Sequence, residues 1–100
     1  MHIISISKLK QFYGKYADAK DALLRWNKST KLAEWENLIE VRQTFNSADQ
    51  VGQLTVFNIK KNKYRLITYI DYKSKKVFIR NFMTHSDYDK NQWKNDPWFK

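Results

Sequence analysis

The most regular hydrophobic pattern of the chain lies in its second half. Three runs of apolar and aromatic residues, 54–59, 64–72 and 76–83, alternate there with the polar segments 60–63 and 73–75. Such runs, bounded by polar turns, predict β-strands, and we expect them to form a three-stranded antiparallel meander. The first turn contains no glycine. Asn62 is therefore its expected residue with positive φ, because asparagine tolerates that region best among the residues available.

Side chains alternate between the two faces of a strand. The expected face of the middle strand that meets a core carries Tyr64, Leu66, Thr68, Ile70 and Tyr72, and the opposite face carries Arg65, Ile67, Tyr69 and Asp71. In the last strand the same rule sets Val77, Ile79 and Asn81 opposite Phe78, Arg80 and Phe82. One face of the sheet is thus suited to packing, and the other mixes apolar with basic side chains.

The first half of the chain predicts helices. Residues 2–6 are a short strand-like start, which we expect to add to the sheet. Ser7 can then cap a helix that reaches Tyr16, and Asp18 can cap a longer helix that reaches about Ala33 and runs antiparallel to the first. Both segments carry apolar residues at helical spacing, namely Leu9, Phe12 and Tyr16 and then Ala19, Ala22, Leu23, Trp26, Thr30 and Ala33.

Two shorter helices complete the pattern. Asn37 with Glu40 is a capping signature for the first of them, and residues 47–50 form a loop behind it. Ser86 with Asp89 repeats the signature near the end of the chain. Pro97 ends that last helix or lies just beyond it. The tail carries three large aromatic residues, Trp93, Trp98 and Phe99, and therefore either docks on the body of the protein or contacts a partner.

Helices followed by a connected antiparallel meander define an α+β fold. We expect one domain over residues 1–100, with the helices on one sheet face and the basic residues on the other, partly open face. The absence of cysteine excludes disulfides and thiolate chemistry. No apolar run approaches the ~20 residues of a membrane-spanning helix, and the start lacks the pattern of a secretory signal. These features predict a cytoplasmic protein without a membrane partner.

Positive charge is concentrated in the predicted sheet. Residues 1–50 hold eight basic and six acidic side chains, whereas residues 51–100 hold eleven and four. Eight Lys or Arg and a single acid, Asp71, lie between Asn58 and Arg80. Such an excess on one half of a chain is typical of a nucleic-acid-binding protein. A lysine-rich solvated surface would give the same composition, so charge alone leaves both interpretations open.

The sequence contains one cluster of residues suited to chemistry. It has no glycine-rich phosphate loop and no spacing of ligands for a metal, and we expect neither a metal nor another cofactor. The cluster comprises Lys60, Lys63, Arg65, Arg80, His85, Tyr88 and Asp89. The two arginines lie on neighbouring strands, and His85 precedes Tyr88 and Asp89 by about one helical turn. Each member also has a structural alternative, such as an edge-strand charge for the arginines or a helix cap for Asp89.

This cluster suits cleavage of RNA without a metal. Cations would stabilise the charge that develops on the phosphate. His85, Tyr88 or a lysine would take the proton of the 2′-hydroxyl, and another of these groups would protonate the leaving 5′-oxygen. An aromatic ring would hold an unstacked base. Because the nucleophile is the 2′-hydroxyl, the expected substrate is RNA and the expected product a 2′,3′-cyclic phosphate.

Several motifs resemble the HigB toxin family of type II toxin–antitoxin systems, within the RelE/ParE superfamily. They are Met1-His2-x-Ile4, Val56-Phe57-Asn58-Ile59-Lys60-x-Asn62-Lys63-Tyr64-Arg65-Leu66-Ile67, Val77-Phe78-Ile79-Arg80 and Met83-Thr84-His85-x-x-Tyr88-Asp89-Lys90. The resemblance covers residues 1 to about 90. Many family members have glycine where this chain has Lys61, and the tail at residues 93–99 is not part of the motifs.

The resemblance implies a RelE-like α+β fold and ribosome-dependent cleavage of mRNA. It also implies neutralisation by a HigA-type helix-turn-helix antitoxin, and repression of operator DNA by the toxin–antitoxin pair. The residues that match the family's motif positions are Asn58, Arg65, Arg80, His85, Tyr88 and Asp89, while Lys60 and Lys63 match loosely. We expect Arg65, Arg80, His85 and Tyr88 to be catalytic, and Asn58, Lys60, Lys63 and Asp89 to bind RNA. The alternatives are a gyrase inhibitor of the same fold, a basic binding module, and an adaptor that binds through its aromatic tail.

Overall fold

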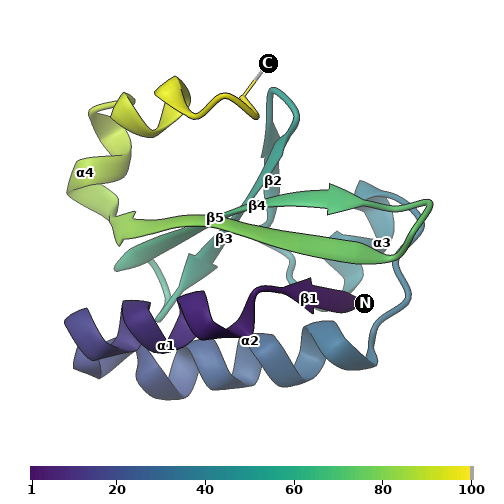
Figure 1. Ribbon diagram of the computed structural model, residues 1–100, viewed down its shortest axis with the longest axis horizontal. Helices are drawn as coiled ribbons and strands as arrows, with labels where there is room; N and C mark the ends of the chain where they lie inside the picture. Colours follow the sequence, from purple (N-terminus) through teal and green to yellow (C-terminus); the bar gives the residue numbers. More distant parts are fainter. Residues whose placement is uncertain (100) are drawn as a thin grey trace.

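A five-stranded mixed sheet is the centre of the protein in the computed structural model, which describes residues 1–99 (Figure 1). The elements are β1 (His2–Ile4), α1 (Ile6–Lys15), the 3-10 helix η1 (Ala17–Ala19), α2 (Lys20–Leu32), α3 (Leu38–Thr44), β2 (Asp49–Val51), β3 (Leu54–Ile59), β4 (Tyr64–Asp71), β5 (Lys76–Thr84), α4 (His85–Asp89) and the 3-10 helix η2 (Gln92–Asn95). The strand order is β1-β5-β4-β3-β2. β1 pairs in parallel with β5, whereas the other three neighbouring pairs of strands are antiparallel.

The main core lies between the sheet and the three N-terminal helices. Leu9 of α1, Leu23 and Trp26 of α2 and Val41 of α3 are buried against it. The ring of Phe57 on β3 packs against three aromatic rings, those of Trp26, Trp35 and Phe45, with centroid distances of 5.4, 6.2 and 5.3 Å. This arrangement confirms the predicted α+β class, with α1 and α2 side by side beneath one face of the sheet (Figure 1).

Two predicted helix starts are wrong. Helix α1 begins at Ile6 after Ser5, not after Ser7. Asp18 does not cap a long helix, because it lies within η1 and α2 begins only at Lys20. The side chain of Asp18 turns instead to the β3–β4 turn, where it accepts hydrogen bonds from Lys60, Lys63 and Tyr64. A contact with a partner more than forty residues away outweighs the local cap.

The predicted caps of the two short helices had different outcomes. Asn37 caps α3 as expected, since its side chain accepts a hydrogen bond from the Glu40 amide at 3.0 Å. Helix α4 is capped by Thr84 and not by Ser86, with the Thr84 hydroxyl accepting from the Asp87 amide at 3.1 Å. Asp89 is consequently the last residue of α4, and Pro97 lies well beyond it, after η2.

The turns and the sheet edge add two corrections. Residues 49–51, assigned in part to a loop, form the edge strand β2 through pairing with β3. In the β3–β4 turn the residues with positive φ are Lys60 (54°) and Lys61 (59°), not Asn62. The side-chain oxygen of Asn62 accepts a hydrogen bond from Arg65 at 2.6 Å. Lys61 thus adopts a conformation that glycine reaches without steric cost.

A β-bulge changes the faces of β5. Ile67 pairs with Asn81 and Thr68 with Ile79, which leaves Arg80 without a partner on β4. One extra residue shifts the alternation of side chains beyond it. Phe82 therefore joins Val77 and Ile79 in the main core, and the prediction that Phe82 faces away from them is wrong.

The opposite face of the sheet is less open than predicted. A second cluster covers part of it, in which Leu54, Val56, Ile67 and Met83 pack with Trp93. Phe99 packs on the edge of this cluster, and Trp98 contacts Tyr69 and Phe78 at centroid distances of 5.3 and 5.2 Å. Of the two predicted alternatives for the aromatic tail, docking on the body is the one observed (Figure 1).

Candidate active site

Seven of the eight predicted site residues gather where the β3–β4 turn meets the start of α4, and Arg80 is the exception. The main-chain amide of His85 donates a hydrogen bond of 2.9 Å to the carbonyl oxygen of Lys63. Thr84, the last residue of β5, pairs with Tyr64, the first residue of β4. Both contacts hold the first turn of α4 beside the lysine-rich turn.

His85 and Asp89 form an exposed pair on α4. His85 Nε2 lies 3.4 Å from Asp89 Oδ2, and the two side chains are 43% and 64% exposed. Helical spacing of four residues places both on one side of α4. The imidazole is thus oriented by a carboxylate and remains accessible to a large substrate.

The lysines of the β3–β4 turn are paired with Asp18. Lys60 Nζ lies 3.1 Å from Asp18 Oδ2, and Lys63 donates to the same oxygen. The Tyr64 hydroxyl donates to Asp18 Oδ1 at 2.5 Å. These hydrogen bonds hold the pKa of Asp18 far below its ordinary value, with the Lys63 bond contributing most, and they raise the pKa of Lys63. The ion pairs themselves are exposed and therefore exchangeable.

Arg65 is the buried member of the cluster. Its side chain donates to the carbonyl oxygens of Asn62 and Tyr64, at 3.0 and 3.1 Å, as well as to the Asn62 side chain. Its guanidinium lies 5.5 Å from the centre of the Tyr88 ring. Only 8% of Arg65 is exposed. The geometry makes Arg65 a support for the turn and for Tyr88.

Tyr88 is half-buried between Arg65 and Trp93. Its ring stacks on that of Trp93 with a centroid distance of 5.0 Å, and its carbonyl oxygen accepts a hydrogen bond from the Trp93 indole. Burial and the negative charges of Asp49 and Asp89 raise the pKa of the Tyr88 hydroxyl, and the positive charge of Arg65 opposes part of this shift. At neutral pH the hydroxyl is therefore a proton donor.

Arg80 lies apart from the other predicted residues. It is the extra residue of the β-bulge and lies about 10 Å of strand from Met83, the partner of Arg65. Its Nε and Nη2 donate to the two carboxylate oxygens of Asp96 at 2.9 and 2.8 Å, and its guanidinium lies 4.1 Å from the Trp98 ring centre. The C-terminal segment thus binds two nitrogens of the Arg80 guanidinium through Asp96 and contacts the guanidinium through the Trp98 ring.

Asn58 is the predicted site residue on β3. It is half-buried on β3, directly opposite Arg65 in the register of β3 and β4. The structure therefore brings Asn58, Lys60, Lys63, Arg65, His85, Tyr88 and Asp89 to one end of the sheet. Arg80 is the predicted residue that it does not bring to them.

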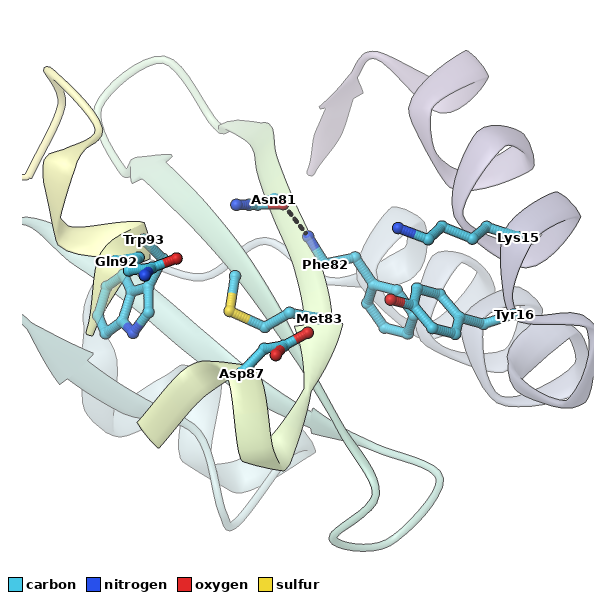
Figure 2. Close-up of a pocket in the computed structure, with 8 residues that line it drawn as sticks. All are labelled: Lys15, Tyr16, Asn81, Phe82, Met83, Asp87, Gln92 and Trp93. Atoms are coloured by element: carbon cyan, nitrogen blue, oxygen red, sulfur yellow. Dashed lines mark hydrogen bonds between the residues drawn. The ribbon is translucent and has the colours of Figure 1, made fainter. Parts of the chain in front are cut away.

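A pocket of about 350 Å³ opens beside this end of the sheet (Figure 2). Its walls come from the end of α1, from β5 after the bulge, from α4 and from η2; the residues used below are Lys15, Tyr16, Asn81, Met83, Asp87 and Trp93. Asn81 and Asp87 are not among the site residues predicted from the sequence. The available signal for both was position: Asn81 follows a strand arginine, and Asp87 lies two residues after His85.

The residues that the structure describes contain neither a cluster of metal ligands nor a membrane-spanning helix. Within residues 1–99 no three histidine, aspartate or glutamate side chains converge as ligands of a metal would. In the same part of the chain no helix is both long enough and apolar enough to cross a membrane.

The helices, the mixed sheet and the exposed imidazole beside lysines define a small basic α+β protein with its candidate chemistry at one sheet end. Residues 19–91 match the HigB toxin family, described as the RelE-like toxic component of a toxin–antitoxin system. The chain belongs to this family. The mRNA interferase toxin HigB of Escherichia coli K12 is 29% identical over 92 residues, which cover 89% of this chain and 88% of that protein. The mRNA interferase HigB of Escherichia coli O6:H1 is 28% identical over 93 residues, or 90% of each chain. Both the resemblance to the family and the predicted RelE-like fold are thereby confirmed.

Proposed function

We propose that this toxin is an mRNA endoribonuclease that cuts during translation on the ribosome. The names of its relatives as mRNA interferases support this activity. We further propose that it acts in the cytoplasm and that an antitoxin of the HigA helix-turn-helix type neutralises it. In this proposal the toxin reaches operator DNA only through the complex with the antitoxin.

One observation carries the proposal. An accessible imidazole, held by a carboxylate at 3.4 Å, lies beside a turn that presents Lys60, Lys61 and Lys63. The lysines attract a polyanion, and the imidazole can move a proton once the polyanion is bound.

The proposed reaction is transesterification without a metal. The 2′-oxygen of the RNA forms a bond to phosphorus, and the bond from phosphorus to the 5′-oxygen breaks. His85 accepts the proton of the 2′-hydroxyl, and Asp89 orients the imidazole and stabilises its protonated form. Tyr88 donates its proton to the leaving 5′-oxygen, and its raised pKa means only that the hydroxyl carries this proton at neutral pH. The products are a 2′,3′-cyclic phosphate and a 5′-hydroxyl.

We assign the binding of RNA phosphates to the cations whose present ion pairs are easiest to break. Lys60 and Lys63 have side chains that are 44% and 55% exposed, and exposed ion pairs contribute only about 0–1 kcal/mol. RNA phosphates can therefore replace Asp18 as their partner. Arg65 already donates three hydrogen bonds to Asn62 and Tyr64, and we assign it to holding Tyr88 in place. Asn58 lies beside it as a further group for RNA.

Arg80 can bind an RNA phosphate only after it has left its present partners. Its two carboxylate bonds to Asp96 and its contact with Trp98 would have to be released before it meets a phosphate. We therefore assign the first test of the site to His85.

The test is primer extension on a reporter mRNA after brief induction of wild type, His85→Ala and His2→Ala. His2 is the matched control, because it is the other histidine of the chain and is exposed on β1. We expect new cuts in the translated region with wild type and His2→Ala and none with His85→Ala. Growth arrest without any cuts would overturn the nuclease and favour a gyrase inhibitor, which a supercoiling assay would detect. Cuts by His85→Ala at the wild-type level would remove His85 from the mechanism.

A further inference from the structure

The pocket of Figure 2 has the features of a site for one nucleobase. We propose that it binds a single unstacked base of the RNA substrate, and that Asn81 and Asp87 read its Watson–Crick edge. The proposal rests on the proposed function for the identity of the substrate. It adds a specificity site that lies across α4 from the catalytic imidazole.

The β-bulge sets the direction of Asn81. Since Arg80 is the extra residue, Asn81 pairs with Ile67 and leaves the main core. Its Oδ1 accepts a hydrogen bond of 2.8 Å from the Phe82 amide. That contact commits the oxygen and leaves the side-chain NH₂ as a donor directed into the pocket (Figure 2). Bulges often re-aim side chains in this way beside active sites.

Asp87 supplies acceptors on another wall of the pocket. It lies in the first turn of α4, and its main-chain amide is used by the Thr84 cap, so the helix fixes its position. The carboxylate has one charged partner, Lys90, at 3.4 Å, and both side chains are more than half exposed. Such a pair gives way easily to a better hydrogen-bonding partner.

The remaining lining residues are mainly aromatic or apolar, with Gln92 and Lys15 as the other polar side chains. Tyr16, Met83 and Trp93 contribute aromatic and apolar atoms to the lining, and the Lys15 side chain extends toward β5 (Figure 2). Single-stranded RNA is recognised by this combination of aromatic contact and hydrogen bonds to base edges. A volume of about 350 Å³ is close to the lower limit of roughly 300 Å³ for small-ligand pockets.

The polar groups favour guanine among the four bases. A carboxylate accepts two hydrogen bonds, and the guanine edge presents two neighbouring donors, N1–H and the N2 amino group. The next atom on that edge, O6, is an acceptor that suits the NH₂ of Asn81. Helix α4 is about 7.5 Å long, so one short RNA segment can contact both Asp87 and His85.

The first experiment measures binding without cleavage. The four nucleoside 3′-monophosphates are titrated up to millimolar concentration while NMR follows the Asn81 side-chain amide and the Trp93 indole. We expect guanosine 3′-monophosphate to shift both signals and to bind about tenfold more tightly than the other three. Asp87→Asn should lose this preference, and the matched control Asp21→Asn, an exposed acid in the first turn of α2, should keep it. Equal affinity for all four nucleotides, preference for another base, or no shift in these signals would overturn the proposal.

The second experiment tests the same site during the reaction. Sequencing of cut ends should show a guanine preference at one position for wild type and for Asn46→Ala, a control in the exposed loop before β2. Asn81→Ala should still cut but lose that preference. An unchanged preference in Asn81→Ala would overturn the assignment. If wild type does not cut at all, the proposed function fails, and the nucleotide titration still decides whether the pocket binds a base.

Discussion

Arg80 and Asp96 form a two-point ion pair that fastens the C-terminal segment to β5. Two nitrogens of the guanidinium meet the two carboxylate oxygens at 2.9 and 2.8 Å, with both side chains less than a quarter exposed. The same guanidinium lies 4.1 Å from the ring centre of Trp98. A residue expected from its motif to meet phosphate is thus, in this structure, the anchor of the tail.

Asp96→Ala should lower the free energy of unfolding by about 1–2 kcal/mol, because it removes charged hydrogen bonds from a partly covered arginine. Urea unfolding followed by tryptophan fluorescence measures the change, since Trp93 and Trp98 lie in the same segment. Asp21→Ala, at an exposed position in the first turn of α2, is the control. A loss equal to that of the control would show that the pair does not hold the tail.

Lys61→Gly should stabilise the protein by about 0.5–1 kcal/mol. Lys61 has a φ of 59°, which costs a non-glycine residue about 1–2 kcal/mol, and the greater chain entropy of glycine cancels part of the gain. The melting temperature measures the change. The control is Lys73→Gly in the β4–β5 turn. Lys73 does not have a positive φ, so glycine there should destabilise the protein. A lower melting temperature for Lys61→Gly would show that the positive φ of Lys61 does not destabilise the wild-type protein.

Asp18→Asn should change how stability depends on pH. The pKa of Asp18 is lowered in the folded state, so its contribution is present above about pH 4, the ordinary range of aspartate, and declines as the pH falls further. The raised pKa of Lys63 acts at the other end, where its contribution is lost as the pH rises above about 10. The difference in unfolding free energy between wild type and Asp18→Asn should therefore be largest between these limits. Urea titrations at pH 2, 7 and 10.5 measure it, and a difference independent of pH would contradict the assignment.

Tyr88→Phe should lower the rate of cleavage about 10²–10⁴-fold, the usual effect of removing a general acid. Stability should change little, since phenylalanine keeps the stacking on Trp93 and the contact with Arg65. Single-turnover cleavage of a short RNA, with a thermal melt on the same sample, measures both. Near wild-type cleavage by Tyr88→Phe, together with loss in Tyr88→Ala, would make Tyr88 a stacking platform and not an acid.

The local patterns predicted most of the regular structure. The bounds of β3 coincide with the prediction, and β4 and β5 differ by one residue each, because alternation and turn residues are properties of neighbouring positions. Strand β2 was not predicted, since three largely exposed residues carry no such pattern and pairing with β3 creates the strand. Seven of the eight motif residues meet at one end of the sheet, where we place the candidate site, but the motifs did not predict the pocket beside it.

The sequence by itself determined the α+β class, the meander, the basic half of the chain and the presence of His85, Tyr88 and Asp89 within one turn. The tertiary structure decided which partners the basic side chains have. It paired Lys60 and Lys63 with Asp18 and Arg80 with Asp96, and it buried Arg65 beneath Tyr88. It also inserted the bulge that directs Asn81 outward. These outcomes depend on contacts between residues far apart in the chain, whose energies no local spacing encodes.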